Sequence, residues 1–256
     1  MLPSTASFLL DLNRRFYADF GPSFAATRRR IQDGVRRILG SLPDAPVQRW
    51  LDLGCGSGPL AVEWLRHGRQ SAYLGLDFSD SLLEEARAAV AGMPGSERVT
   101  FGRGDLSDPN WASGLEPGFN GILAFASLHH LPSQGLREQV LRQVRNLLDF
   151  SNPAGAPARF IHSEWQFQNS PKLMARRVPW ESAGLRESDL EPGDTLLDWR
   201  AAIPGQPESV GLRYVHLFDR DELAGLASAA GFRILEEFES DGEGGRLGLY
   251  QVWEPV

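Results

Sequence analysis

Three glycines at alternate positions follow a carboxylate in the segment 51–58, Leu-Asp-Leu-Gly-Cys-Gly-Ser-Gly. Glycine reaches left-handed backbone dihedrals and lets a ligand approach without a Cβ atom in the way, so Gly54, Gly56 and Gly58 can form a ligand-binding turn beside Asp52. The spacing differs from the dinucleotide-binding G-x-G-x-x-G loop, and no Gly-Lys-Ser/Thr follows as in a phosphate-binding loop. Ordinary turn glycines are the alternative interpretation.

Two further carboxylates end short apolar runs downstream of this loop, Asp77 and Asp105. A carboxylate at the carboxyl end of a second strand can accept hydrogen bonds from a ribose diol, so Asp77 is a candidate for that contact. The alternative is that Asp77 caps the following helix, although Ser79 or Asp80 is better placed to do so. Asp105 is a second cofactor-contact candidate, and its alternative role is to cap or close a turn.

The remaining reactive side chains are Cys55 and the pair His129-His130, which follows a long apolar run. Cys55 is the single cysteine, and the sequence indicates no basic residue that could activate it. We therefore expect Cys55 to be a small residue that fills space in the loop and not a catalytic nucleophile. His129 is a candidate general base, with packing as the alternative. Adjacent residues on one loop rarely converge on an ion and no third ligand is evident, so no metal site is predicted.

The elements that position these residues alternate between strand and helix. Residues 43–152 supply four strand–helix units, and 159–165 is an apolar fifth strand. Residues 232–240 and 246–253 flank a glycine-rich turn and predict a hairpin. The pattern predicts an α/β fold with a parallel sheet that ends in an antiparallel hairpin.

Two segments lie outside this alternation. Residues 5–20 and 24–40 predict two helices with a break between them, and together residues 1–42 are expected to form an N-terminal helical lid. The interval 167–212 is rich in Pro, Trp and Gly and too long for a simple connection, which predicts a substrate cap.

A glycine loop is followed by two strand-end carboxylates and then by an apolar strand that leads into a polar loop. In this order, residues 45–150 resemble the class I S-adenosylmethionine-dependent methyltransferases. The resemblance implies a Rossmann-like seven-stranded sheet within residues 43–256 and S-adenosylmethionine as the cofactor. It implies that the lid adds Tyr17 and Arg28, with Arg28 at the methionine carboxylate. The other implied cofactor residues are Asp52, Gly54, Cys55, Gly56, Gly58, Asp77, Phe78, Asp105, Leu106 and Ala126.

The segment 212–218, Leu-Arg-Tyr-Val-His-Leu-Phe, resembles the Arg-Tyr-Tyr-His segment of the methyltransferases that esterify carboxymethyluridine at the tRNA wobble position. The segment 24–28 resembles the N-terminal Thr-Arg of that family. The resemblance implies that Arg213, Tyr214 and His216 line the acceptor site and that the Arg213 guanidinium orients an acceptor carboxylate. A buried ion pair is the alternative role for Arg213.

The predicted function is therefore methyl transfer to a carboxylate or a modified uridine of tRNA. A small-molecule O- or N-methyltransferase, a non-catalytic partner with this fold and an NAD-dependent oxidoreductase are the alternatives. An activating protein partner is left open. Arginines are concentrated in the first forty residues, which indicates either an RNA-binding patch or a solvent-exposed helix face. The net charge of −7 excludes general binding of polyanions by the whole protein.

The composition also bears on the compartment. A single cysteine excludes a disulfide scaffold. The sequence carries no signal-peptide pattern at its start and no apolar run long enough to span a bilayer. These features predict a cytoplasmic protein.

The cofactor prediction can be tested by calorimetry. S-adenosylhomocysteine is expected to bind and NAD is not. Asp77→Ala is expected to weaken S-adenosylhomocysteine binding by on the order of a kcal/mol or more, because a charge-assisted pair to the ribose is lost. Tight NAD binding without S-adenosylhomocysteine binding would overturn the cofactor assignment, and unchanged affinity in folded Asp77→Ala would make Asp77 a helix cap.

Overall fold

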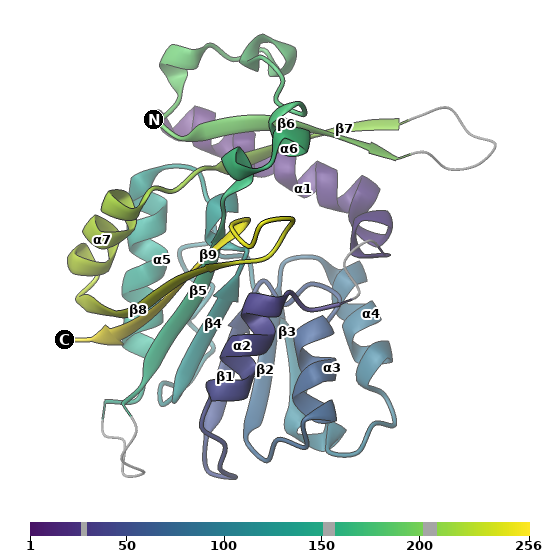
Figure 1. The fold of residues 1–256 in the computed structure, drawn as a ribbon, viewed down its shortest axis with the longest axis vertical. Coiled ribbons are helices and arrows are strands. Elements are labelled where there is room, and N and C mark those ends of the chain that lie inside the picture. The colour runs from purple at the N-terminus through teal and green to yellow at the C-terminus, as the bar shows by residue number, and fades with distance from the viewer. Residues whose placement is uncertain (27–29, 151–156, 202–208) are drawn as a thin grey trace.

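Short apolar strands form one mixed sheet through the centre of the molecule (Figure 1). The computed structural model describes residues 1–26, 30–150, 157–201 and 209–256, and within these ranges the sheet has seven strands in the order β3-β2-β1-β4-β5-β9-β8. The strands are β1 (Arg49–Leu53), β2 (Ala72–Asp77), β3 (Val99–Arg103), β4 (Gly121–Phe125), β5 (Arg159–Trp165), β8 (Phe232–Ser240) and β9 (Gly248–Pro255). The first five are parallel, and β9 pairs antiparallel with both β5 and β8. The predicted Rossmann-like sheet with an antiparallel C-terminal hairpin is confirmed.

Helices cover both faces of the sheet because successive strand side chains point to opposite sides. Leu51 and Leu53 pack with the buried residues of α5 (Gln134–Leu147) and α7 (Arg220–Ala229). Trp50 packs on the other face with α2 (Asp33–Ser41) and α3 (Pro59–Arg66), and α4 (Asp80–Val90) lies beside α3. Short 3-10 helices span Ser96–Arg98, Leu128–His130, Phe167–Asn169, Trp180–Ala183 and Glu187–Asp189.

A smaller unit lies above the carboxyl ends of the strands (Figure 1). It contains α6 (Pro171–Met174) and a separate antiparallel pair, β6 (Asp194–Ala201) and β7 (Ser209–His216). The buried side chains of Phe167, Leu197 and Val215 pack together as a separate small core of this unit. The interval predicted as a cap therefore carries this hairpin, and β7 continues to His216.

The first helix, α1 (Pro3–Ala26), runs between this hairpin and the main sheet (Figure 1). The predicted break near residues 21 and 22 is wrong, because the helix continues to Ala26. Tertiary packing explains the difference: the rings of Phe16 and Phe20 lie against Trp199, and Gly211 leaves the space that Phe20 fills. Within the described ranges, no helix is both long and apolar enough to cross a membrane.

Gly121 on β4 offers a test of how tightly the sheet packs. A Cβ atom there would overlap the ring of Trp50, which is 2% exposed. Gly121→Ala is therefore expected to lower the free energy of unfolding by about 1–3 kcal/mol. Gly135→Ala in α5 is the control, since a Cβ there meets nothing within 4 Å and alanine favours a helix. Equal denaturant midpoints for the two variants would contradict this packing.

Candidate functional site

The turn that follows β1 adopts the left-handed dihedrals that its glycines allow. Gly54, Gly56 and Gly58 have φ angles of 77°, 54° and 77°. The Gly54 amide donates to the Leu76 carbonyl at 2.8 Å, and the Gly56 amide donates to Oδ2 of Asp77 at 2.9 Å. The turn is therefore tied by backbone and side chain to the end of the neighbouring strand β2.

Each glycine is required for a different reason. A Cβ at Gly54 would collide with the Ser127 hydroxyl, whereas one at Gly56 would meet nothing within 4 Å. Gly56 therefore needs only its dihedral freedom, and the space beside it is open for a ligand. Gly58 is the N-cap of α3 and is left-handed, and a Cβ there would lie 2.9 Å from Ala86 of α4, so the close packing of the two helices adds to the requirement for glycine.

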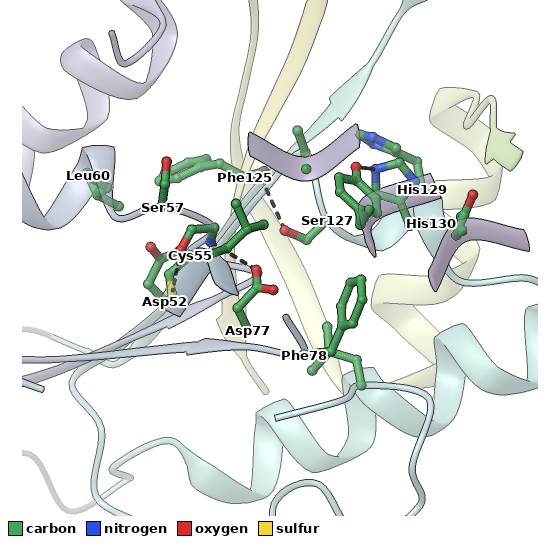
Figure 2. A pocket seen from close by; sticks show the side chains of 18 of the residues that line it. Asp52, Cys55, Ser57, Leu60, Asp77, Phe78, Phe125, Ser127, His129 and His130 are labelled. Atoms are coloured by element: carbon green, nitrogen blue, oxygen red, sulfur yellow. Dashed lines mark hydrogen bonds between the residues drawn. The ribbon is translucent and has the colours of Figure 1, made fainter. Parts of the chain in front are cut away.

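A cavity of about 250 Å³ opens beside this turn, at the carboxyl ends of the strands and below α1 (Figure 2). Most of the residues predicted to bind the cofactor line it: Asp52, Gly54, Cys55, Gly56, Asp77, Phe78, Asp105, Leu106, Ala126 and Tyr17. Gly58 is not among the lining residues, and Arg28 lies outside the described residues.

Asp77 keeps hydrogen-bonding capacity for a ligand. Its Oδ2 accepts from the Gly56 amide and its Oδ1 accepts from the Ser79 amide, each at 2.9 Å. The backbone amide of Phe78 also acts on this carboxylate. Because a carboxylate has about four acceptor sites, Asp77 still has capacity for a ligand. The helix α4 is capped by Ser79, whose hydroxyl accepts from the Leu82 amide, and the preference for Ser79 or Asp80 as the cap is confirmed. Burial raises the pKa of Asp77, and the amides of Ser79 and Gly56 oppose the rise.

Asp52 is buried at the wall of the cavity and accepts a hydrogen bond from the Tyr73 hydroxyl. Burial raises the pKa of Asp52 to about 7; the charge of Asp77 adds to this effect and the Tyr73 hydrogen bond opposes it. Burial and the same two carboxylates raise the pKa of the Cys55 thiol. Because only a thiolate is a good nucleophile, this supports the interpretation of Cys55 as a small loop residue.

Asp105 faces the helix above the cavity. Its carboxylate accepts from the Arg14 guanidinium at 2.9 Å and from the Ser107 hydroxyl at 2.6 Å. Burial of the carboxylate acts to raise the pKa of Asp105, but the hydrogen bonds from Arg14 and Ser107 outweigh burial, and the pKa is lowered. Asp105 is therefore ionised and is joined to α1.

Helix α1 is held over the cavity by contacts along its length. The Asn13 side chain exchanges two hydrogen bonds with the backbone of Tyr214 on β7. Oη of Tyr17 lies 2.9 Å from Nε2 of His130, and its ring meets the edge of Phe78. Tyr17 of the predicted lid thus lies between Phe78, which follows β2, and the histidine loop.

The histidine loop includes a partner that the sequence argument missed. His129 lines the cavity, and its Nδ1 lies 3.2 Å from Oε2 of Glu164, the penultimate residue of β5. Nδ1 of His162 lies 2.9 Å from Oε1 of the same carboxylate. The sequence could have indicated this contact, because the fourth and fifth predicted strands pair in parallel and their carboxyl ends must therefore be adjacent. Figure 2 places both histidines of the loop away from Asp52, across the cavity. Among the described residues, no cluster of potential metal ligands is present.

The three residues predicted to line the acceptor site separate onto two faces of β7. Arg213 lines the cavity and is buried, with its guanidinium 4.9 Å from the Trp165 ring and 5.4 Å from the Phe16 ring. Tyr214 and His216 do not line it, because neighbouring residues of a strand alternate between faces. Burial lowers the pKa of Arg213, and a hydrogen bond with Tyr17 opposes this.

Tyr214 and His216 instead join the hairpin to the main body. The Tyr214 hydroxyl and Nδ1 of His216 each lie 2.8 Å from Oδ1 of Asp194. Nε2 of His216 lies 2.9 Å from Oε2 of Glu222 on α7. Burial disfavours the charged imidazole, but these two carboxylates outweigh it and raise the pKa of His216.

Comparisons with known proteins agree with this architecture. Residues 51–150 match a family model described as a methyltransferase domain. A protein of Encephalitozoon cuniculi, whose name states methyltransferase and no acceptor, is 28% identical over 224 residues, 87% of each chain. The 27-O-demethylrifamycin SV methyltransferase of Amycolatopsis mediterranei is 26% identical over 138 residues, 54% of this chain and 47% of that protein. The solved glycopeptide N-methyltransferase MtfA, complexed with S-adenosyl-L-homocysteine, has a TM-score of 0.62 at 18% identity and covers 89% of this chain and 88% of its own.

The buried Asp52 generates a pH prediction. Its carboxyl group ionises near pH 4 in the unfolded chain and near pH 7 in the folded one, so the folded state holds the extra proton between these values. Its contribution to stability is complete below pH 4 and is lost as the pH rises through 7. Asp52→Asn is expected to remove this loss, raising the free energy of unfolding relative to wild type by on the order of 3 kcal/mol between pH 4 and pH 8.

Chemical denaturation across that pH range measures the difference. Asp108→Asn is the control, because Asp108 is exposed. Parallel stability curves for wild type and Asp52→Asn would show that Asp52 ionises normally in the fold.

Proposed function

We propose that this protein is an S-adenosylmethionine-dependent methyltransferase whose acceptor is a small organic molecule that carries a carboxylate. In this proposal residues 1–42 form the lid, residues 43–256 form the methyltransferase domain and the interval 167–212 is the cap over the acceptor. The match of residues 51–150 to a methyltransferase domain supports the reaction class.

The residues at the glycine turn fit the cofactor. The open space beside Gly56 suits a close ligand, and the remaining lone pairs of Asp77 suit the two hydroxyls of a ribose. The ionised Asp105 is a second carboxylate that lines the cavity. When bound, S-adenosylmethionine supplies a methyl group on a sulfonium, and the protein's part is to hold an acceptor in line with it.

One observation carries the choice of acceptor. The buried guanidinium of Arg213 reaches the cavity between the rings of Trp165 and Phe16, under the β6–β7 hairpin. A planar guanidinium binds a carboxylate through two parallel hydrogen bonds, and the flanking rings restrain its plane. This geometry supports a carboxylate as the group that orients the acceptor.

The charges at the surface favour a small acceptor over tRNA. Three arginines of the N-terminal helices pair with carboxylates of the same chain: Arg14 with Asp105, Arg36 with Asp33 and Arg37 with Glu236. Arginines neutralised in this way contribute less to a phosphate-binding surface. The net charge of −7 further disfavours a polyanionic acceptor.

The acceptor can be tested by measuring S-adenosylhomocysteine formation with a panel of small carboxylic acids and with bulk tRNA at two salt concentrations. Turnover is expected with a small acid and to change little with salt. Arg213→Lys is expected to lose at least about 10-fold in kcat/KM, because lysine keeps the charge but lacks the planar fork. Arg186→Lys is the control, since Arg186 is exposed and pairs with Asp189.

Two results would overturn the proposal. Methylation of tRNA that falls steeply with salt would assign an RNA acceptor. Full activity of Arg213→Lys would remove the carboxylate contact.

A further inference from the structure

His216 is the last residue of β7, at the point where the chain leaves the β6–β7 hairpin and leads into α7. Its imidazole is 1% exposed and lies between two carboxylates. Nδ1 lies 2.8 Å from Oδ1 of Asp194 on β6, and Nε2 lies 2.9 Å from Oε2 of Glu222 on α7. The ring therefore bridges the hairpin and the main domain.

The two carboxylates determine the protonation state of this ring. A neutral imidazole has one N–H donor and one lone pair, so in either tautomer the lone pair would face a carboxylate oxygen at 2.8 or 2.9 Å. An imidazolium carries a proton on both nitrogens and donates to both carboxylates. Asp194 is held as an acceptor, because its Oδ1 also accepts from the Tyr214 hydroxyl and its Oδ2 accepts from the Glu191 amide.

The ionisable side chains around the ring come from each element that packs against it: Tyr214 on β7, Asp194 on β6, Glu222 on α7 and Arg137 on α5. Burial and the positive charge of Arg137 disfavour a charged ring. The hydrogen bonds with the two carboxylates outweigh them and raise the pKa of His216 above its ordinary value of 6.5. The charge of Arg137 is itself compensated, since its guanidinium lies 2.8 Å from Glu191 and 3.2 Å from Glu222.

The opposite face of β7 carries Arg213. Side chains alternate along a strand, so Arg213 lines the cavity while His216, three residues later, faces Asp194 and Glu222. The imidazole thus holds β7 to the main domain from one face, and the strand presents its guanidinium from the other. A movement of β7 relative to α7 would displace the guanidinium from the cavity.

We propose that His216 is a positioning residue that, as an imidazolium, fixes the β6–β7 hairpin to α7 and thereby holds Arg213 at the cavity. Loss of one ring proton replaces a hydrogen bond by a contact between a lone pair and a carboxylate, and this loosens the hairpin. The role of Arg213 rests on the proposed function, whereas the charge of the ring and the loosening of the hairpin do not.

The direction of the pH dependence follows from the raised pKa. The folded-state pKa of His216 is higher than the ordinary value of 6.5, so the imidazolium contributes fully to stability below pH 6.5. That contribution is lost as the pH rises through the folded-state pKa. The hairpin is therefore held in weakly acidic solution and loosens in alkaline solution.

Nitrogen-15 NMR of the imidazole rings in the ligand-free protein measures the charge directly. The His216 signals are assigned by their loss in His216→Gln and, independently, by their proximity to the Phe218 ring, whose centroid lies 4.7 Å away. At pH 6.5 wild type is expected to carry protons predominantly on both ring nitrogens. A ring that is half or more neutral at pH 6.5 would overturn the inference.

Glu222→Gln tests the contact with α7, because glutamine keeps an acceptor oxygen but removes the charge. At pH 6 the amides of β6 and β7 are expected to exchange hydrogen at least about 10-fold faster in this variant than in wild type, by mass spectrometry with rates corrected for intrinsic exchange. The difference is expected to narrow towards pH 9, where the wild-type ring also loses its charge. Asp221→Asn is the control, since Asp221 is an exposed acidic residue of the same helix turn.

The pH dependence separates the imidazolium from a purely structural contact. A difference in exchange that is the same from pH 6 to pH 9 would assign it to the contact of Glu222 with Arg137 and overturn the inference. Equal exchange in wild type and folded Glu222→Gln at pH 6 would also overturn it.

Turnover tests the connection to Arg213. In wild type the KM for the acid acceptor is expected to rise by up to about 10-fold at alkaline pH, the loss expected for Arg213→Lys. In Glu222→Gln the same rise is expected at a lower pH. Identical pH profiles of this KM in the two proteins would overturn the positioning role. Failure of the proposed function is seen separately, as the absence of S-adenosylhomocysteine binding by calorimetry.

Discussion

The hydrogen bond from the Gly56 amide to the Asp77 carboxylate connects the two strands on which the site depends. It forms only because Gly54 and Gly56 turn the chain back through left-handed dihedrals at the end of β1. The same turn leads into α3 and leaves Asp77 at the lining of the cavity. A side chain at Gly54 would collide with Ser127, which follows β4. The carboxyl ends of β1, β2 and β4 are therefore packed together at this point.

The cavity gains its second wall from segments that lie far from the glycine turn in the sequence. Asn13 binds the backbone of β7, and Arg14 binds Asp105, so α1 joins the hairpin to the main sheet. The aromatic side chains of α1 pack on Trp199 of β6.

Buried charges in this molecule serve two different purposes. Around His216, the carboxylates of Asp194 and Glu222 and the guanidinium of Arg137 join the hairpin to α7 and α5 and do not line the cavity. At the cavity, by contrast, the buried Arg213 lines the space that a ligand would fill. The alternation of side chains along β7 separates these purposes within four residues.

The local part of the site followed from the sequence by itself. The glycine spacing, the strand-end carboxylates and the Ser79 cap are set by dihedral limits and hydrogen bonds between residues close in the chain, and the alternation of strands and helices implied the sheet and its hairpin. Long-range packing decided the rest. The pairing of β4 with β5 placed Glu164 beside His129, and packing against the hairpin kept α1 helical past its glycine. Strand parity turned Tyr214 away from Arg213, because a motif in sequence does not record which face each side chain will occupy until its strand has a partner.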